Sequence, residues 1–84
     1  MRILLAEDEA AIRSHVEAAL GAAGYLVTCC ADGPTAWETG GTETFDAIVL
    51  DLGLPGLDGL TLLKRWRAEG VDTPVLVLTA RGSW

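Results

Sequence analysis

Three apolar segments of the chain each run directly into side chains that could bind a metal ion or a phosphate group. Residues 3–6 precede Glu7 and Asp8, residues 47–50 precede Asp51, and residues 75–78 precede Thr79. If these segments are strands of one parallel sheet, their carboxyl ends meet at the edge where open α/β sheets bind ligands. The sequence therefore predicts one acidic pocket.

The carboxylates of this predicted pocket would repel one another. Two carboxylates about 4 Å apart repel by about 4 kcal/mol at an effective dielectric constant of about 20, so Glu7, Asp8 and Asp51 need a cation or a proton to coexist. Magnesium fits, because it prefers oxygen ligands and is usually held by one or two carboxylates together with phosphate oxygens. An aspartate beside such an ion can act as a nucleophile and form an aspartyl phosphate. The Thr79 hydroxyl could then donate to a phosphoryl oxygen.

Each of these residues also has an ordinary explanation when it is taken alone. An acidic pair such as Glu7 and Asp8 commonly lies at a helix amino terminus, where it interacts favourably with the helix dipole. A single aspartate or threonine is common in loops. The shared position of these residues, at the ends of three predicted strands, favours the metal and phosphate interpretation.

The elements that must position these residues alternate between strand-like and helix-like segments. Strands are expected at residues 2–6, 25–30, 45–50 and 75–78, and helices at residues 9–23, from Pro34 to a stop at 39–41, and from an Asp58 cap to Gly70. This alternation is typical of α/β proteins. We expect a doubly wound parallel sheet, with Trp66 in or beside its core and Arg13 on the outer face of the first helix.

Length and composition exclude several classes of protein. A chain of 84 residues is at most one small domain. Its apolar runs are far shorter than the roughly 20 residues of a membrane helix, and it reaches Glu7 too early for a secretion signal. We therefore expect a cytoplasmic protein without membrane contact. A net charge of −6 with a single lysine leaves no basic surface for nucleic acid.

Two cysteines and one histidine carry no function in this interpretation. Cys29 and Cys30 are adjacent and would point to opposite faces of a strand. They are therefore interpreted as strand packing rather than as a disulfide or a thiol sensor. His15 lies outside the apolar stripe of the first helix, and we expect it to be an isolated surface histidine.

Three motifs together resemble the receiver domain of bacterial two-component response regulators. Residues 1–9, MRILLAEDE, are similar to the opening of that family; residues 51–59, DLGLPGLDG, fit its phosphoacceptor segment D-L-x-L-P-x-x-D-G; and residues 77–81, VLTAR, resemble the end of its fourth strand. The resemblance covers essentially the whole chain. It implies a flavodoxin-like receiver fold.

The resemblance implies a role for each residue that matches a motif. It makes Asp51 the phosphoacceptor. It makes the carboxylates of Glu7, Asp8 and Asp51 ligands of Mg²⁺, with the backbone carbonyl of Gly53 as a further ligand. It makes Thr79 the phosphate ligand and switch, and Ala80 the small residue that leaves room for the phosphoryl donor. Pro55 and Gly59 would shape the loop before the third helix.

The resemblance also implies partners. A sensor histidine kinase would supply the phosphoryl group, and phosphorylation would switch a downstream output. Similarity to regulators with winged-helix DNA-binding domains favours transcription regulation as that output. The chain would catalyse at most its own phosphorylation and dephosphorylation, so we do not expect a conventional enzyme.

The chain departs from the family pattern in its extent. The family's last strand, its last two helices and the lysine after the last strand have no counterpart in these 84 residues. Lys64 lies within the predicted third helix and cannot replace that lysine. We therefore expect residues 1–84 to be the N-terminal portion of a receiver domain, incomplete after strand four. The apolar edge at residues 75–78 would then be unpaired, so we expect the fragment to self-associate.

Other functions fit the sequence less well. A haloacid-dehalogenase-type phosphatase also uses a strand-end aspartate nucleophile, but it has a second acid two residues later, where this chain has Gly53. A nucleotide- or flavin-binding module favours a glycine-rich loop after the first strand, where this chain has three acidic residues. A phosphate-independent interaction module with a vestigial acidic pocket stays open, and failure to bind Mg²⁺ would distinguish it.

Overall fold

A computed structural model of the protein describes residues 1–78. Strands and helices alternate along this part of the chain: β1 (Arg2–Ala6), α1 (Ala10–Ala22), β2 (Leu26–Cys30), α2 (Gly33–Thr42), β3 (Ala47–Asp51), α3 (Gly59–Ala68) and β4 (Val75–Leu78). All neighbouring strands are parallel, in the order β2-β1-β3-β4. The expected doubly wound, flavodoxin-like sheet is confirmed, and its order follows the pattern of that fold as far as β4.

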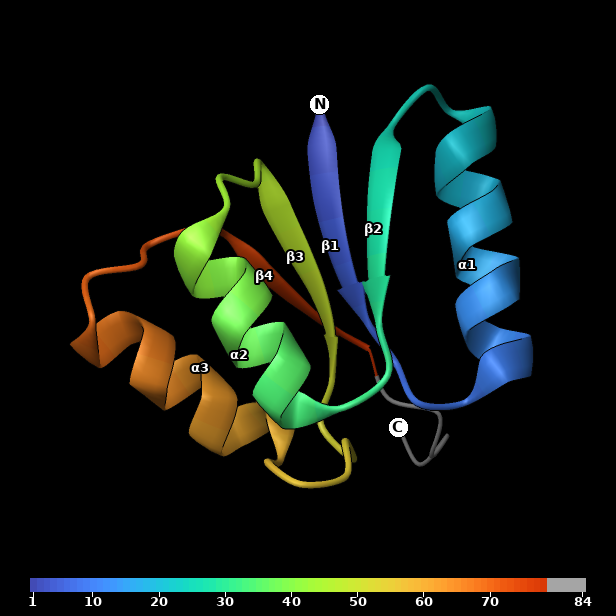
Figure 1. The fold of residues 1–84 in the computed structure, drawn as a ribbon. Helices are drawn as coiled ribbons and strands as arrows, with labels where there is room; N and C mark the ends of the chain where they lie inside the picture. The colour runs from blue at the N-terminus through green and yellow to red at the C-terminus, as the bar shows by residue number, and fades with distance from the viewer. Residues whose placement is uncertain (79–84) are drawn as a thin grey trace.

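The helices cover the two faces of the sheet unequally. Figure 1 shows α1 on one side of the sheet and α2 and α3 together on the other. Because successive strand residues point to opposite faces, β1 contributes Leu4 to the core beneath α2 and α3 and Leu5 to the core beneath α1. The central strands β1 and β3 are buried on both faces, which explains their nearly continuous apolar sequence.

Helix α2 continues further than the sequence indicated. Its start agrees with the expected turn, because the Asp32 side chain accepts a hydrogen bond from the Thr35 amide at 2.8 Å. The expected stop at residues 39–41 is wrong, since the helix runs through both glycines to Thr42. Gly40 lies directly against the indole of Trp66, which is fully buried as anticipated. This close packing against Trp66 outweighs the low helix propensity of glycine.

The helices of residues 1–78 fall short of the requirements for a membrane-spanning helix. None of them combines the length and the apolar character that a transmembrane span requires.

The two adjacent glycines of α2 give a matched test of this packing. A Cβ atom on Gly40 would lie 2.6 Å from Cζ2 of Trp66, whereas a Cβ on Gly41 meets nothing within 4 Å. We predict that Gly40→Ala lowers the free energy of unfolding by about 1–3 kcal/mol through overpacking. Gly41→Ala should raise it, by up to about 1 kcal/mol, through helix propensity. Urea unfolding measures both, and equal effects of the two variants would contradict the packing account.

Candidate functional site

The structure brings three of the predicted site residues together. Glu7, Asp8 and Asp51 each offer a carboxylate oxygen, and these oxygens all lie within 4.8 Å of one another. Glu7 and Asp8 follow β1, and Asp51 ends the adjacent strand β3, where Ala6 is paired in register with Leu50. The cluster thus lies at the carboxyl edge of the sheet, toward the lower part of Figure 1. The roles that the sequence assigned to these residues stay predictions.

Glu7 is the most constrained of the three carboxylates. Its side chain is only 1% exposed and that of Asp51 only 7%, whereas Asp8 is exposed. Glu7 Oε1 accepts a hydrogen bond from the Glu9 amide at 3.1 Å. The other oxygen, Oε2, is buried without a hydrogen-bond partner among residues 1–78. A buried acceptor without a partner is costly, so Glu7 leaves one position that a cation or a proton would satisfy.

The electrostatics of the cluster also favour a cation or a proton beside Glu7. Burial raises the pKa of Glu7 above its ordinary value, and the charges of Asp51 and Asp8 raise it further, while the hydrogen bond from the Glu9 amide opposes this rise. A divalent cation with oxygen ligands would remove both the desolvation and the repulsion. The donor set and the unpaired oxygen therefore fit a hard divalent cation such as Mg²⁺, for which these three carboxylates are the candidate ligands.

The loop after β3 is shaped around Asp51. The Gly53 amide donates to Asp51 Oδ1 at 3.3 Å, which places Gly53 beside the carboxylate. Helix α3 starts very close to the strand end, because a Cβ on Gly59 would lie 2.6 Å from the Asp51 carbonyl oxygen. The Asp58 side chain caps α3 by accepting from the Thr61 amide at 3.0 Å, as expected. Only glycine at position 59 permits this approach.

Two predicted site residues, Thr79 and Ala80, lie outside the described residues. The last described residue of β4, Leu78, is paired in register with Asp51.

Sequence reasoning missed Arg13. It was expected on the outer face of the first helix, but the structure places it half-buried, with Nη1 donating to the Glu7 carbonyl at 2.8 Å and to the Asp8 carbonyl at 3.4 Å. A contact with backbone carbonyls leaves no pattern of residue types. The one feature of the sequence that could have indicated this contact is the short separation of Arg13 from the acidic pair Glu7 and Asp8.

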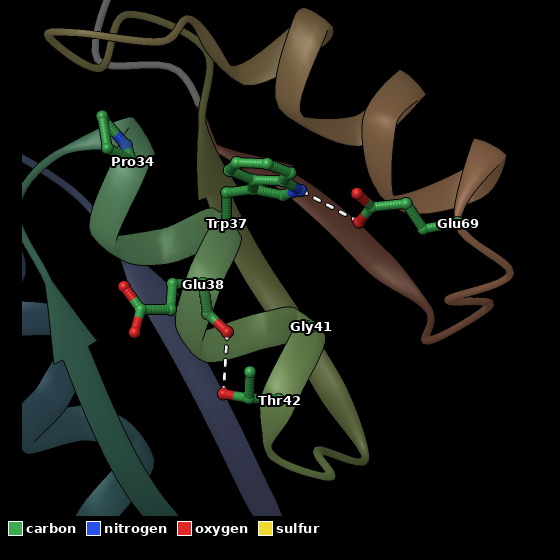
Figure 2. A pocket seen from close by; sticks show the side chains of 6 residues that line it. All are labelled: Pro34, Trp37, Glu38, Gly41, Thr42 and Glu69. Carbon is green, nitrogen blue, oxygen red and sulfur yellow. Dashed lines mark hydrogen bonds between the residues drawn. The ribbon is translucent and has the colours of Figure 1, made fainter.

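A separate groove lies along α2 and reaches Glu69, the residue after α3. It has a volume of about 420 Å³ and is lined by Pro34, Trp37, Glu38, Gly41, Thr42 and Glu69. Figure 2 shows two hydrogen bonds within this group of residues. Trp37 Nε1 donates to Glu69 Oε1, with a distance of 2.9 Å between these atoms, and the Thr42 hydroxyl donates to the Glu38 carbonyl, with a distance of 2.8 Å. None of the clustered carboxylates lines this groove, so the groove and the acidic cluster are at different places.

The cysteines and the histidine offer no competing site among residues 1–78. Burial raises the pKa of the thiols of both Cys29 and Cys30, which disfavours the reactive thiolate. His15 is exposed on α1.

Comparisons with protein families and with known proteins agree with the predicted receiver domain. The family model described as response regulator receiver domain matches residues 3–83. All 84 residues align with the two-component response regulator PhoP of Pseudomonas aeruginosa at 42% identity and with the transcriptional regulatory protein PhoP of Escherichia coli at 43%. The chain spans 37% and 38% of the lengths of these two proteins.

Solved structures share the fold closely. The receiver domain of the Francisella response regulator 1452 matches with a TM-score of 0.92 and 34% identity over 98% of this chain and 68% of that one. The receiver domain of the sensor histidine kinase PA1611 from Pseudomonas aeruginosa has a magnesium ion in its active-site cleft. It matches with a TM-score of 0.89 and 39% identity, over 95% of this chain and 67% of that one. A chain in the complex of the histidine kinase ThkA with the response regulator TrrA matches with a TM-score of 0.88 and 29% identity, over 99% of this chain and 72% of that one.

Replacing Glu7 by Gln tests the electrostatic strain of the metal-free cluster. Because burial raises the pKa of Glu7 above 4.5, its protonated form stabilises the fold below that pH, and this contribution is lost as the pH rises through the raised pKa. Glu7→Gln removes the charge, so we predict a higher free energy of unfolding than wild type at pH 7, by on the order of 1 kcal/mol. The difference should shrink at pH 4.

The measurement is urea unfolding in EDTA at both pH values. Glu38→Gln, at an exposed position on α2, is the matched control and should show no such pH-dependent gain. A Glu7→Gln protein that is less stable than wild type at pH 7 would contradict this account of the cluster.

Proposed function

The chain belongs to the response regulator receiver domains, and from this premise we propose that it is a phosphoacceptor module in which Asp51 takes a phosphoryl group in the presence of Mg²⁺. The observation that carries the proposal is the acidic cluster. Three carboxylates meet at the edge of two adjacent strands, and one buried oxygen of Glu7 has no partner within residues 1–78. The receiver domain of PA1611, with magnesium in its active-site cleft, supports the choice of ion.

Asp51 is suited to act as the nucleophile. One of its oxygens, Oδ1, accepts from the Gly53 amide, and the other carboxylate oxygen would attack the phosphorus of a donor. In that step a bond forms between the carboxylate oxygen and phosphorus, the bond from phosphorus to the donor breaks, and the leaving group keeps its electron pair. Bound Mg²⁺ would neutralise charge on the transferring group. The rigid strand end holds Asp51 in place for the transfer.

The remaining ligand roles follow the family pattern. We propose that Glu7, Asp8 and Asp51 hold the ion together with the Gly53 backbone carbonyl, whose peptide group adjoins the Asp51 carboxylate. Thr79 would donate its hydroxyl to the phosphoryl group and act as the switch.

Ala80 would leave room for the donor. Support for the roles of Thr79 and Ala80 comes from the motif VLTAR at residues 77–81.

The proposal extends to partners and output. A sensor histidine kinase is the expected donor, which the ThkA–TrrA complex supports. The PhoP relative of Escherichia coli is a transcriptional regulatory protein, and this supports an output domain that binds DNA, with the protein in the cytoplasm. Residues 1–84 would be the N-terminal portion of a receiver domain, a proposal in keeping with a match to about two thirds of the solved receivers. The chain would catalyse only its own phosphorylation and dephosphorylation.

Intact mass spectrometry after incubation with Mg²⁺ and acetyl phosphate tests the phosphoacceptor role. We predict that wild type gains the mass of one phosphoryl group and that Asp51→Asn gains none. Asp58→Asn is the matched control, because Asp58 caps α3 and lies outside the cluster, and it should gain the group like wild type. EDTA should abolish the gain.

Two outcomes would count against the proposal. A phosphoryl gain that persists in Asp51→Asn would place the acceptor elsewhere. No gain in wild type would favour a phosphate-independent interaction module.

We also propose that the 84-residue chain self-associates through the outer edge of β4. Within residues 1–78, β4 pairs only with β3, and its Leu76 and Val77 side chains are 67% and 43% exposed. An exposed apolar edge strand is a template for pairing with another chain. We predict an average mass above that of one chain in light scattering at micromolar concentration.

Leu76→Lys should restore the mass of a single chain, because a charge on an edge strand opposes pairing. Leu60→Lys is the control, since Leu60 is 52% exposed on α3, and it should leave the association unchanged. A wild-type chain that is monomeric would show this proposal to be wrong.

A further inference from the structure

The loop between β1 and α1 carries two of the three clustered carboxylates and has few backbone contacts of its own. Glu7 donates its amide to the Cys30 carbonyl at 3.0 Å. Within residues 1–78, no backbone amide donates to the carbonyl of Glu7 or of Asp8. Glu9, the N-cap of α1, makes no side-chain cap hydrogen bond. The sheet therefore fixes where this loop starts, and the Glu9 amide holds Glu7 Oε1, but no backbone amide within residues 1–78 holds the peptide carbonyls of Glu7 and Asp8.

Arg13 supplies the missing contacts. From the second turn of α1 its Nη1 reaches back to the Glu7 carbonyl at 2.8 Å, a short hydrogen bond, and to the Asp8 carbonyl at 3.4 Å, a longer one. Among residues 1–78 the guanidinium makes no ion pair with a carboxylate at 4.0 Å or less. Its contacts are with the backbone of the acidic residues and not with their charges.

We propose that Arg13 is a positioning residue, whose guanidinium holds the Glu7 and Asp8 peptide groups so that both carboxylates face Asp51 in a geometry that binds a divalent cation. The inference rests on the proposed function, because it assigns Arg13 a task in the same metal site. Arginine suits this task better than lysine, since its planar group carries several donors in a fixed arrangement.

Positioning and charge make opposite predictions for this residue. Arginine is always charged, so a guanidinium near the cluster repels a divalent cation, and charge alone predicts that removing it tightens Mg²⁺ binding. Positioning predicts that removing it weakens Mg²⁺ binding, because the carboxylates lose their preset orientation. The sign of the change in affinity therefore separates the two roles.

The experiment measures the Mg²⁺ dissociation constant at pH 7 by isothermal titration calorimetry, with MgCl₂ as the titrant. We expect Arg13→Gln to bind Mg²⁺ about 10-fold more weakly than wild type, as residues that orient metal ligands usually do when replaced. Arg13→Lys keeps the charge and most of the side chain, so it also serves if the Gln variant fails to fold. We expect Arg13→Lys to fall between wild type and Arg13→Gln.

Arg67→Gln is the matched control. Arg67 makes the same kind of contact elsewhere, donating to the Val71 carbonyl at 2.7 Å and to the Thr73 carbonyl at 2.9 Å in the loop that leads into β4. It lies at the amino edge of the sheet, away from the cluster. Arg67→Gln should leave the Mg²⁺ affinity unchanged, whatever it does to the melting temperature measured without metal.

Each other outcome has a definite meaning. Unchanged or tighter Mg²⁺ binding by both Arg13 variants would overturn the positioning role while leaving the metal site in place. Equal weakening in Arg13→Gln and Arg67→Gln would also overturn it, since the effect would then be general destabilisation. A wild-type chain that does not bind Mg²⁺ would overturn the proposed function itself, and the positioning role with it.

Discussion

The mutual repulsion of Glu7, Asp8 and Asp51 is the constraint on which the rest of this structure depends. Their nearest oxygens lie within 4.8 Å of one another, a spacing at which like charges repel unless something neutralises them. The parallel pairing of β1 with β3 imposes this spacing, because it places the residues after Ala6 beside those after Leu50. The same pairing builds the most buried part of the sheet. The chain therefore cannot relieve the repulsion by separating its strands without losing its core.

The two sides of the sheet support this edge in different ways. Beneath α2 and α3, the buried indole of Trp66 packs against the bare backbone at Gly40, and the resulting close fit fixes the layer behind β3. At the edge itself, Gly59 lets α3 start directly over the end of β3. In the acidic loop Glu7 is buried, and the side-chain contacts of α1 with its backbone come from Arg13. The Asp51 side of the site is held by close backbone packing at Gly59, and the Glu7 and Asp8 side by hydrogen bonds from the Glu9 amide and from Arg13.

Much of this arrangement follows from sequence pattern, and the exceptions have physical causes. Strand positions, their parallel arrangement and the meeting of three acids follow from the alternation of strand-like and helix-like segments and from apolar runs that end on carboxylates. The extent of α2 did not follow, because glycine propensity is local while the contact of Gly40 with Trp66 joins distant parts of the chain. The unpaired oxygen of Glu7 and the carbonyl contacts of Arg13 were equally hidden, since burial and backbone hydrogen bonds depend on three-dimensional placement.

The central claim is that the acidic cluster is the place where the chain binds a divalent cation. Paramagnetic broadening of backbone amide NMR signals by Mn²⁺ tests this most directly, because Mn²⁺ shares the preference of Mg²⁺ for carboxylate and carbonyl oxygens. At low ratios of Mn²⁺ to protein, the account predicts that the signals of residues 7–9 and 51–53 lose intensity first and that excess Mg²⁺ restores them. Broadening that is spread over the other acidic residues, or that centres on the groove between Glu38 and Glu69, would contradict it.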